Sequence, residues 1–222
     1  MGEIVTYSYE GKDWSGYLAA GPSGSPGVIL VQEWWGLVGH IKSVADRLAA
    51  EGFTVLAPDF YHGEMTAEPD VAGSLMMALQ VDDAARLILA SVSHLKSQGC
   101  QGGIGAIGFC MGGQLSLFAA CLTPDIKACI DFYGIHPNVS PDLAALQAPL
   151  LGIFAEHDEY ASPQAVSDLS QRLTELGKAH EFKTYMGVHH AFFNDERPSV
   201  YDPEAAKDAW ERVLRHLRTN LS

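Results

Sequence analysis

The sequence lacks long apolar runs and is poor in cations. No stretch of its 222 residues reaches the roughly 18 consecutive apolar residues that a membrane-spanning helix needs. The first residues also lack the basic and apolar regions of a secretory signal. Lys and Arg number 14 against 27 Asp and Glu, a formal net charge of −13 with no basic cluster. We therefore expect a soluble, cytoplasmic protein that binds neither membranes nor nucleic acids.

Cysteine is also scarce, and its spacing excludes two kinds of site. The four cysteines stand at positions 100, 110, 121 and 129. This spacing fits neither a CxxC redox pair nor a zinc site. A chain with 47% hydrophobic residues can bury a sizeable core without disulfides. We expect one domain over residues 1–222, no metal site, and a monomer or weak homo-oligomer.

Apolar runs alternate along the chain with segments of helical periodicity. A hairpin is predicted at residues 4–9 and 14–20, and strands at 27–31, 53–57, 104–107, 128–132, 149–154 and 180–186. Helices are predicted at 41–51, 70–97, 114–122, 163–176 and 203–217. Strands that alternate with helices are typical of a mostly parallel sheet flanked by helices. The predicted fold class is therefore α/β.

The most informative segment is Gly-Phe-Cys-Met-Gly-Gly at residues 108–113. It follows a predicted strand and begins a predicted helix, which is the pattern of a nucleophile elbow. The glycines allow the tight, strained turn, and the helix directs the positive end of its dipole toward Cys110. A packed core cysteine in a glycine-rich turn explains such a lone motif equally well. The partners of Cys110 must decide between these interpretations.

An acid and a histidine follow later strands in the order of an α/β-hydrolase triad. Asp158 comes after the strand at 149–154, and His190 comes after the strand at 180–186. Parallel strands bring their carboxyl ends to one edge, so these side chains should meet near Cys110. Imidazole can accept the thiol proton and return it, while a carboxylate orients the ring. From the residues alone the acid could also be Glu156 or Glu159, and the base could be His189.

The segment after the third predicted strand offers an oxyanion hole and an unusual carboxylate. The backbone N–H groups of Trp34 and Met111 are the natural pair of donors for a tetrahedral intermediate. Glu33 precedes Trp34, and a carboxylate beside a nucleophile is unusual for an ordinary serine esterase. The alternative is a charge at a strand end that faces solvent.

Five motifs together resemble the dienelactone hydrolase family. They lie at residues 32–37, 57–61, 108–113, 156–158 and 190–192, and the resemblance covers nearly the whole chain. The resemblance implies a single-domain α/β-hydrolase fold that opens lactones or esters through a cysteine acyl-enzyme, without metal or cofactor. It also implies that Cys110 is the nucleophile, that His190 rather than His189 is the base, and that Asp158 is its partner.

The resemblance further implies that Glu33 is a switch. In the family the corresponding glutamate holds the resting cysteine protonated, then swings away or accepts the proton when substrate arrives. Such an arrangement makes physical sense because a permanent thiolate is open to oxidation.

The chain departs from the family where a substrate carboxylate would bind. Family members that act on the dienelactone use two arginines, one before the elbow and one four residues after the catalytic histidine. Here Asn194 stands at the second place, and no arginine lies between Arg47 and Arg86. Arg197 could reach the site, or it could form a surface ion pair with its acidic neighbours. We therefore expect little preference for anionic lactones.

Aromatic residues near the strand ends are candidates for a largely apolar substrate pocket. With Arg197, the candidates are Trp35, Phe60, Tyr61, Phe109, Tyr133 and Phe192. Core packing explains aromatic residues equally well, so we expect about half of them to touch a ligand. The apolar segment 74–79 is either a lid or the buried face of a helix.

Three functions remain open at this point. The first is a cysteine hydrolase of small esters or lactones. The others are a non-catalytic small-molecule binding protein with this fold, and a redox-sensing thiol protein built on Cys110. A complete set of Cys110, Asp158 and His190 in triad order favours the hydrolase over the binding protein. The absence of a resolving cysteine close to Cys110 in sequence disfavours the redox sensor.

Overall fold

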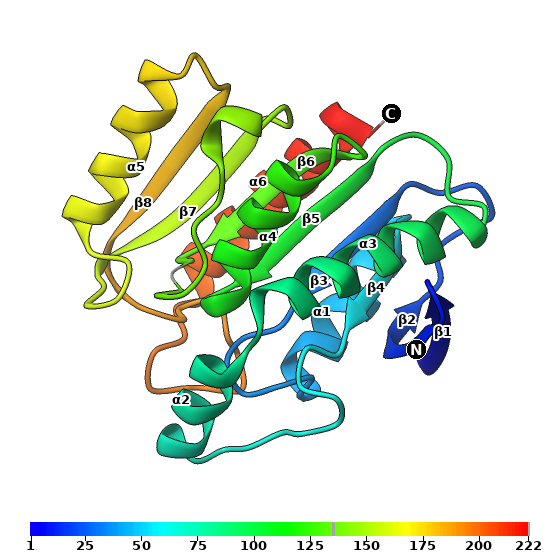
Figure 1. Ribbon diagram of the computed structural model, residues 1–222. Helices are drawn as coiled ribbons and strands as arrows, with labels where there is room; N and C mark the ends of the chain where they lie inside the picture. Colours follow the sequence, from blue (N-terminus) through cyan, green and yellow to red (C-terminus); the bar gives the residue numbers. More distant parts are fainter. Residues whose placement is uncertain (135, 222) are drawn as a thin grey trace.

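A computed structural model describes residues 1–134 and 136–221, and the strands that it contains form one eight-stranded sheet (Figure 1). The strands are β1 Glu3–Tyr9, β2 Lys12–Ala19, β3 Gly27–Val31, β4 Thr54–Pro58, β5 Ile104–Phe109, β6 Ile126–Phe132, β7 Leu150–His157 and β8 His180–His189. Their order across the sheet is β1-β2-β4-β3-β5-β6-β7-β8. All pairs from β4 to β8 are parallel, and β2 pairs antiparallel with both β1 and β4. The predicted α/β fold with a mostly parallel sheet is confirmed.

Helices cover both faces of this sheet (Figure 1). They are α1 Gly39–Ala50, α2 Pro69–Ala78, α3 Val81–Ser97, α4 Met111–Leu122, α5 Pro163–Glu175 and α6 Pro203–Leu221. Successive side chains of β3 enter different cores: Val28 and Leu30 pack in the cluster with α1 and α6, whereas Ile29 and Val31 pack in the cluster with α3 and α4. Every residue of β3 is buried, as expected for a central parallel strand.

The segment predicted as one helix over 70–97 is two helices. Leu79 and Gln80 are extended, with ψ of 122° and 121°, and they separate α2 from α3. Asp82 and Asp83 lie in the first turn of α3, where carboxylates favour a helix N-terminus. This acidic pair therefore marks a helix start that the apolar periodicity conceals.

Three strands end later than predicted, and this brings the candidate residues closer to the sheet. Cys110 directly follows β5, Asp158 directly follows β7 and His190 directly follows β8. All three strands are parallel members of one sheet, so the residues after them emerge at the same edge. Among the described helices, none is both long and apolar enough to cross a membrane.

Candidate active site

Cys110 occupies a strained turn between β5 and α4. Its φ of 54° and ψ of −122° are rare for a residue with a side chain. A Cβ atom on Gly108 would overlap the carbonyl oxygen of Gly112, and one on Gly112 would overlap the carbonyl oxygens of Val31 and Gln32. Only glycine fits at these two positions. The two glycines thus let β5, α4 and the end of β3 approach closely around the thiol.

Asp158 holds His190 from a buried position. The Oδ2 atom of Asp158 lies 2.7 Å from Nδ1 of His190. Its Oδ1 atom accepts hydrogen bonds from the backbone N–H groups of Tyr160 and Ala161, at 2.8 and 2.9 Å. With both oxygens occupied and its side chain shielded from solvent, Asp158 is fixed as an acceptor for the imidazole N–H.

The competing acids and the competing base lie elsewhere. Glu156 accepts a hydrogen bond from the backbone N–H of Gly187, and Glu159 is exposed. The exposed ring of His189 faces that of His157, with ring centres 5.2 Å apart. The geometry therefore pairs Asp158 with His190 and leaves these alternatives at the rim.

His190 has a strongly perturbed pKa. Burial favours the neutral ring, but the interactions with Asp158 and Cys110 outweigh burial and raise the pKa of His190 to about 10. Asp158 and a negatively charged Cys110 thus both favour the imidazolium form of the ring. A cationic ring next to Cys110 stabilises negative charge on the sulfur.

Two tyrosine rings contact the imidazole of His190. The ring centre of Tyr133 lies 4.8 Å from that of His190, and the ring centre of Tyr160 lies 5.1 Å away. Tyr133 is fully buried, and no described residue bonds its hydroxyl. Burial and the nearby charge of Glu33 raise the pKa of Tyr133 well above its ordinary value. Sequence reasoning missed Tyr160, although its place two residues after Asp158 could have indicated it.

Glu33 is buried rather than solvent-facing, with 1% of its surface exposed. Its Oε2 atom accepts a hydrogen bond of 2.8 Å from Nδ2 of Asn194. Glu33 also lines the cavity that contains Cys110 and His190. The structure therefore excludes the interpretation of Glu33 as a solvated charge at a strand end.

The two predicted oxyanion donors lie at the ends of the segments that flank the thiol. Met111 is the first residue of α4, so its N–H has no acceptor within its own helix. Trp34 belongs to a turn in which the N–H of Gly36 bonds the carbonyl of Glu33 at 3.4 Å. Trp34 also lines the cavity beside Cys110.

A cavity of about 990 Å³ opens beside Cys110, Asp158 and His190. Its largely apolar wall contains Trp34, Trp35, Met76, Pro137, Tyr160 and Val200. Its charged lining consists of Glu33, Glu156, Glu159 and Arg197 in addition to the triad residues. Within the described residues, no group of three or more His, Cys, Asp and Glu side chains is arranged to hold a metal ion.

Most of the aromatic residues predicted to line the pocket lie outside this cavity. Phe109, Tyr133 and Phe192 are fully buried in the core, where their rings pack on one another and on neighbouring rings. Phe60 and Tyr61 line a separate cavity of about 210 Å³. The prediction that these five residues line the substrate pocket is corrected, because core packing accounts for Phe109, Tyr133 and Phe192, and Phe60 and Tyr61 border the smaller cavity instead.

Trp35 and Arg197, by contrast, do line the cavity. The guanidinium carbon of Arg197 lies 5.7 Å from the ring centre of Trp35. In the part of the chain that the structure describes, Arg197 forms no ion pair with Asp195 or Glu196. The surface ion pair considered for Arg197 is therefore not formed, and its charge faces the site.

Segment 74–79 covers most of the last two turns of α2 and borders both cavities. Met76 lines the large cavity, whereas Leu75 and Leu79 line the small one. Met77 is 51% exposed, and Ala72 is the buried residue of α2. Leu75, Met76 and Leu79 are also partly buried against the core cluster that contains α3 and α4, so segment 74–79 packs on the core and forms part of the site wall.

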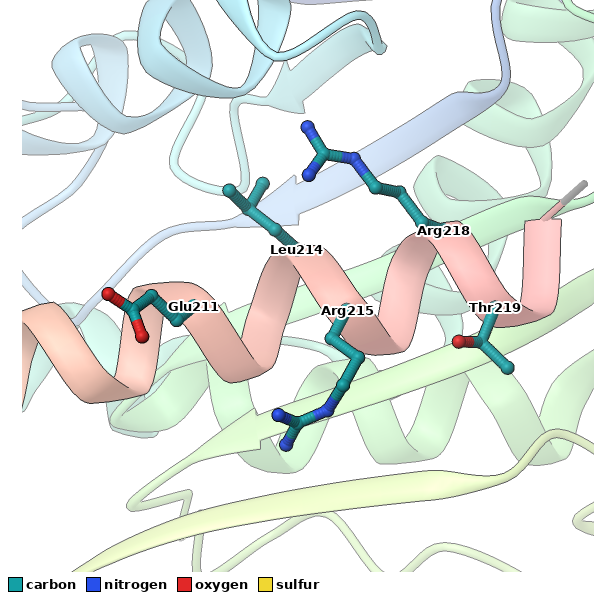
Figure 2. A pocket seen from close by; sticks show the side chains of 5 residues that line it. All are labelled: Glu211, Leu214, Arg215, Arg218 and Thr219. Carbon is teal, nitrogen blue, oxygen red and sulfur yellow. The ribbon is translucent and has the colours of Figure 1, made fainter.

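Another hollow lies on the surface of α6 (Figure 2). It has a volume of about 480 Å³ and is lined by Glu211, Leu214, Arg215, Arg218 and Thr219. None of these five side chains is a nucleophile with an adjacent base. The cavity beside Cys110 is therefore the candidate active site.

The model of the dienelactone hydrolase family matches residues 15–221 of the chain. The chain belongs to this family. It is 38% identical over 233 aligned residues to Protein usf of Aquifex pyrophilus, and 35% identical over 232 residues to an Aquifex aeolicus protein provisionally named a carboxymethylenebutenolidase. Each alignment covers 100% of both chains. As a dienelactone hydrolase family member, the protein is a hydrolase of the class that acts on esters and lactones.

Solved structures confirm the dienelactone hydrolase fold. A provisionally named dienelactone hydrolase of Klebsiella pneumoniae superposes with a TM-score of 0.85 at 26% identity, over 98% of this chain and 99% of that chain. The dienelactone hydrolase-like promiscuous phosphotriesterase P91 from metagenomic libraries superposes with a TM-score of 0.88 at 22% identity, over 100% of this chain and 99% of that one. The expected α/β-hydrolase architecture is thus confirmed over the length of the chain.

Proposed function

We propose that this protein hydrolyses small esters or lactones through an acyl-enzyme on Cys110. The observation that carries the proposal is the 2.7 Å contact between Asp158 and His190 in the cavity that holds Cys110. The other thiols are poor candidates, because burial raises the pKa of Cys100, raises that of Cys121 to about 11, and raises that of Cys129 well above its ordinary value.

In the first step the sulfur of Cys110 attacks the substrate carbonyl carbon, and the proton that leaves the thiol resides on His190. The new S–C bond forms as the carbonyl electron pair moves to oxygen, where the N–H groups of Trp34 and Met111 stabilise the charge. The intermediate then expels the alkoxide, which takes the proton from His190. A thioester and a neutral imidazole remain.

In the second step His190 removes a proton from water, and the oxygen attacks the thioester carbon. The second tetrahedral intermediate expels the sulfur as a thiolate, so the acid product leaves and the Cys110 thiolate faces the His190 imidazolium, which can return its proton to the sulfur. Asp158 stabilises the imidazolium each time it forms.

In this scheme Glu33 favours the protonated thiol of Cys110, whereas Asp158 and His190 favour its loss of the proton. The pair draws the proton from Cys110, whereas a buried negative charge on Glu33 disfavours a second one on the nearby sulfur. We assign to Glu33 the role of keeping the thiol protonated until substrate arrives. This balance would protect the thiol from oxidation between turnovers.

The charges around the cavity favour neutral substrates over anionic ones. Glu33, Glu156 and Glu159 contribute carboxylates, and Arg197 contributes a cation. The apolar wall suits an acyl group or a lactone ring. We therefore propose neutral small esters and lactones as the substrate class, with Arg197 as the group that would receive any substrate carboxylate.

The test is a hydrolysis assay with p-nitrophenyl acetate and with neutral and anionic lactones. Cys110→Ala should lose at least about 1,000-fold in kcat/KM, because the nucleophile is removed. Cys121→Ala is the matched control and should retain activity, since this thiol lies outside the cavity.

Activity that survives in Cys110→Ala would rule out this thiol as the nucleophile. A wild-type protein that binds lactones without turning them over would identify the binding protein instead. Reversible modification of Cys110 by mild oxidation, in a protein that forms no acyl-enzyme, would favour the redox sensor.

A further inference from the structure

Asn194 connects the turn after the base to the buried carboxylate of Glu33. Its backbone N–H bonds the carbonyl of Ala191 at 3.0 Å, which closes the tight turn after His190. Its Nδ2 atom donates to Oε2 of Glu33 at 2.8 Å across 161 positions of sequence. Asn194 is 3% exposed, so this bond is shielded from water.

The orientation of the Asn194 amide is determined by a second hydrogen bond. Its Oδ1 atom accepts from the backbone N–H of Glu196 at 3.0 Å. The oxygen must face this N–H, and the NH₂ group must therefore face Glu33. In this hydrogen bond, Asn194 is therefore the donor through Nδ2, and Glu33 is the acceptor through Oε2.

We propose that Asn194 is the positioning residue for Glu33, and that it holds the carboxylate in its charged, resting orientation beside the thiol. The proposal rests on the proposed function, because it assigns the group that governs Glu33 in that mechanism. Asn194 is a neutral donor, so it stabilises the carboxylate without cancelling its charge. The negative charge thereby remains available to act on Cys110.

The other charged or titratable groups near Glu33 come from four segments of the sheet edge. They are Cys110 after β5, Tyr133 after β6, Glu156, His157, Asp158 and Glu159 at the end of β7 and just after it, and His189, His190 and Arg197 at the end of β8 and after it. Of these groups, His190 and Arg197 carry positive charge, and Asp158 already engages His190. Substitution of Asn194, which removes the direct hydrogen bond to Glu33, is therefore the simplest way to change the position and charge of the Glu33 carboxylate.

The substitution Asn194→Asp tests this role with minimal change of shape. Oδ1 can still accept from the N–H of Glu196, but an acceptor replaces the donor that faces Glu33. Two adjacent carboxylates cannot both remain charged, so they should share a proton. We expect the pH profile for alkylation of Cys110 by iodoacetamide to shift by about one pH unit or more. We also expect the Tm to fall by about 5 °C.

The double variant Glu33→Gln with Asn194→Asp reverses the polarity of the pair. The new amide at position 33 can donate to the new carboxylate at position 194, so the Tm should recover most of the loss. The charge no longer sits at position 33, so the alkylation profile should match that of Glu33→Gln alone. If Asn194 only packed against its neighbours, the Tm would not recover in the double variant while the alkylation profile stayed that of Glu33→Gln.

Asn220→Asp is the matched control for an added negative charge. The amide of Asn220 donates to the carbonyl of His216 on α6, and it does not contact Glu33. This variant should keep the wild-type alkylation profile. Because alkylation requires no substrate, a wild-type protein without esterase activity would refute the proposed function and still allow the coupling to be measured.

Two results would overturn the role of Asn194. One is an unchanged alkylation profile in Asn194→Asp despite a lower Tm, which would show that the residue only packs. The other is a double variant whose loss of Tm equals the sum of the two single losses, which would show that the residues are not coupled.

Discussion

The inner and outer parts of the active site differ in how firmly they are held. In the inner part, Glu33, Asp158 and Asn194 are almost completely buried, and each is hydrogen-bonded to a defined partner. In the outer part, Tyr160 is 57% exposed, and Arg197 contacts the ring of Trp35 without an ion pair among the described residues.

This difference separates the chemistry from the choice of substrate. Reacting groups must be held within about half an ångström of their productive positions, which buried groups at strand ends can achieve. Groups that only contact the substrate can lie on surface segments, where sequence changes disturb the core little. We therefore expect the substrate range of this protein to be set mainly by α2, by residues 156–160 and by the loop after His190.

The largest contrast between the two parts should come from the same substitution at two glycines. Gly108→Ala should destabilise the fold by more than about 4 kcal/mol, because its Cβ would overlap the backbone of Gly112. Gly73→Ala on α2 should stabilise it by roughly 0.5–1 kcal/mol, since the Cβ would lie 3.9 Å from the ring of Trp34 and alanine favours helix. Denaturant unfolding measures both. Equal effects would refute the distinction between inner and outer parts.

Removal of the acid should have the next largest effect. Asp158→Asn should lower kcat/KM by about 1,000-fold or more, because the amide no longer stabilises the imidazolium of His190. It should leave KM for neutral esters nearly unchanged. A similar loss in Glu156→Gln, the control at the rim, would contradict the assignment of the acid.

The same variant should change how stability depends on pH. The pKa of His190 is about 10 in the folded protein against an ordinary value of 6.5. This raised pKa contributes stability that is fully present below pH 6.5 and is lost as the pH rises through 10. Thermal unfolding from neutral to alkaline pH should therefore show a smaller alkaline loss in Asp158→Asn than in wild type. Parallel curves would show that the acid does not raise this pKa.

The smallest effect is expected at the outer part of the site. Arg197→Ala should lower kcat/KM for anionic lactones by about 3- to 10-fold, because one partly exposed cation contributes modestly to binding a carboxylate. Neutral lactones should be affected less than about twofold. Arg215→Ala, on the outer surface of α6, serves as the charge-matched control. Equal losses of kcat/KM for neutral and anionic lactones would show that Arg197 does not recognise the substrate's charge.

The sequence predicted the inner part of the site better than the outer part. The strand ends predicted the edge of the sheet at which Cys110, Asp158 and His190 lie, because parallel strands end at a common edge. The resemblance to the family, rather than the spacing, selected Asp158 and His190 from their neighbours. The aromatic residues could not be divided between core and cavity, because packing and ligand binding select the same side chains. Phe109 and Phe192 therefore proved to be core residues, whereas Tyr160 at the cavity was missed.

Two further features depend on contacts that sequence spacing does not contain. The break between α2 and α3 follows from the extended backbone at Leu79 and Gln80 within an otherwise helical pattern. The bond between Glu33 and Asn194 joins residues that are 161 positions apart. Only the folded sheet brings these two side chains together.

The most direct test of the central claim is mass spectrometry of the protein quenched with acid during turnover of p-nitrophenyl acetate. The account predicts one acetyl group on Cys110, located by peptide mapping, and no acetyl group on Cys121. The adduct should accumulate when Asp158 is replaced by Asn, because we expect deacylation to slow more than acylation. Turnover of the ester without any acyl group on Cys110, in wild type and in this variant, would contradict the account.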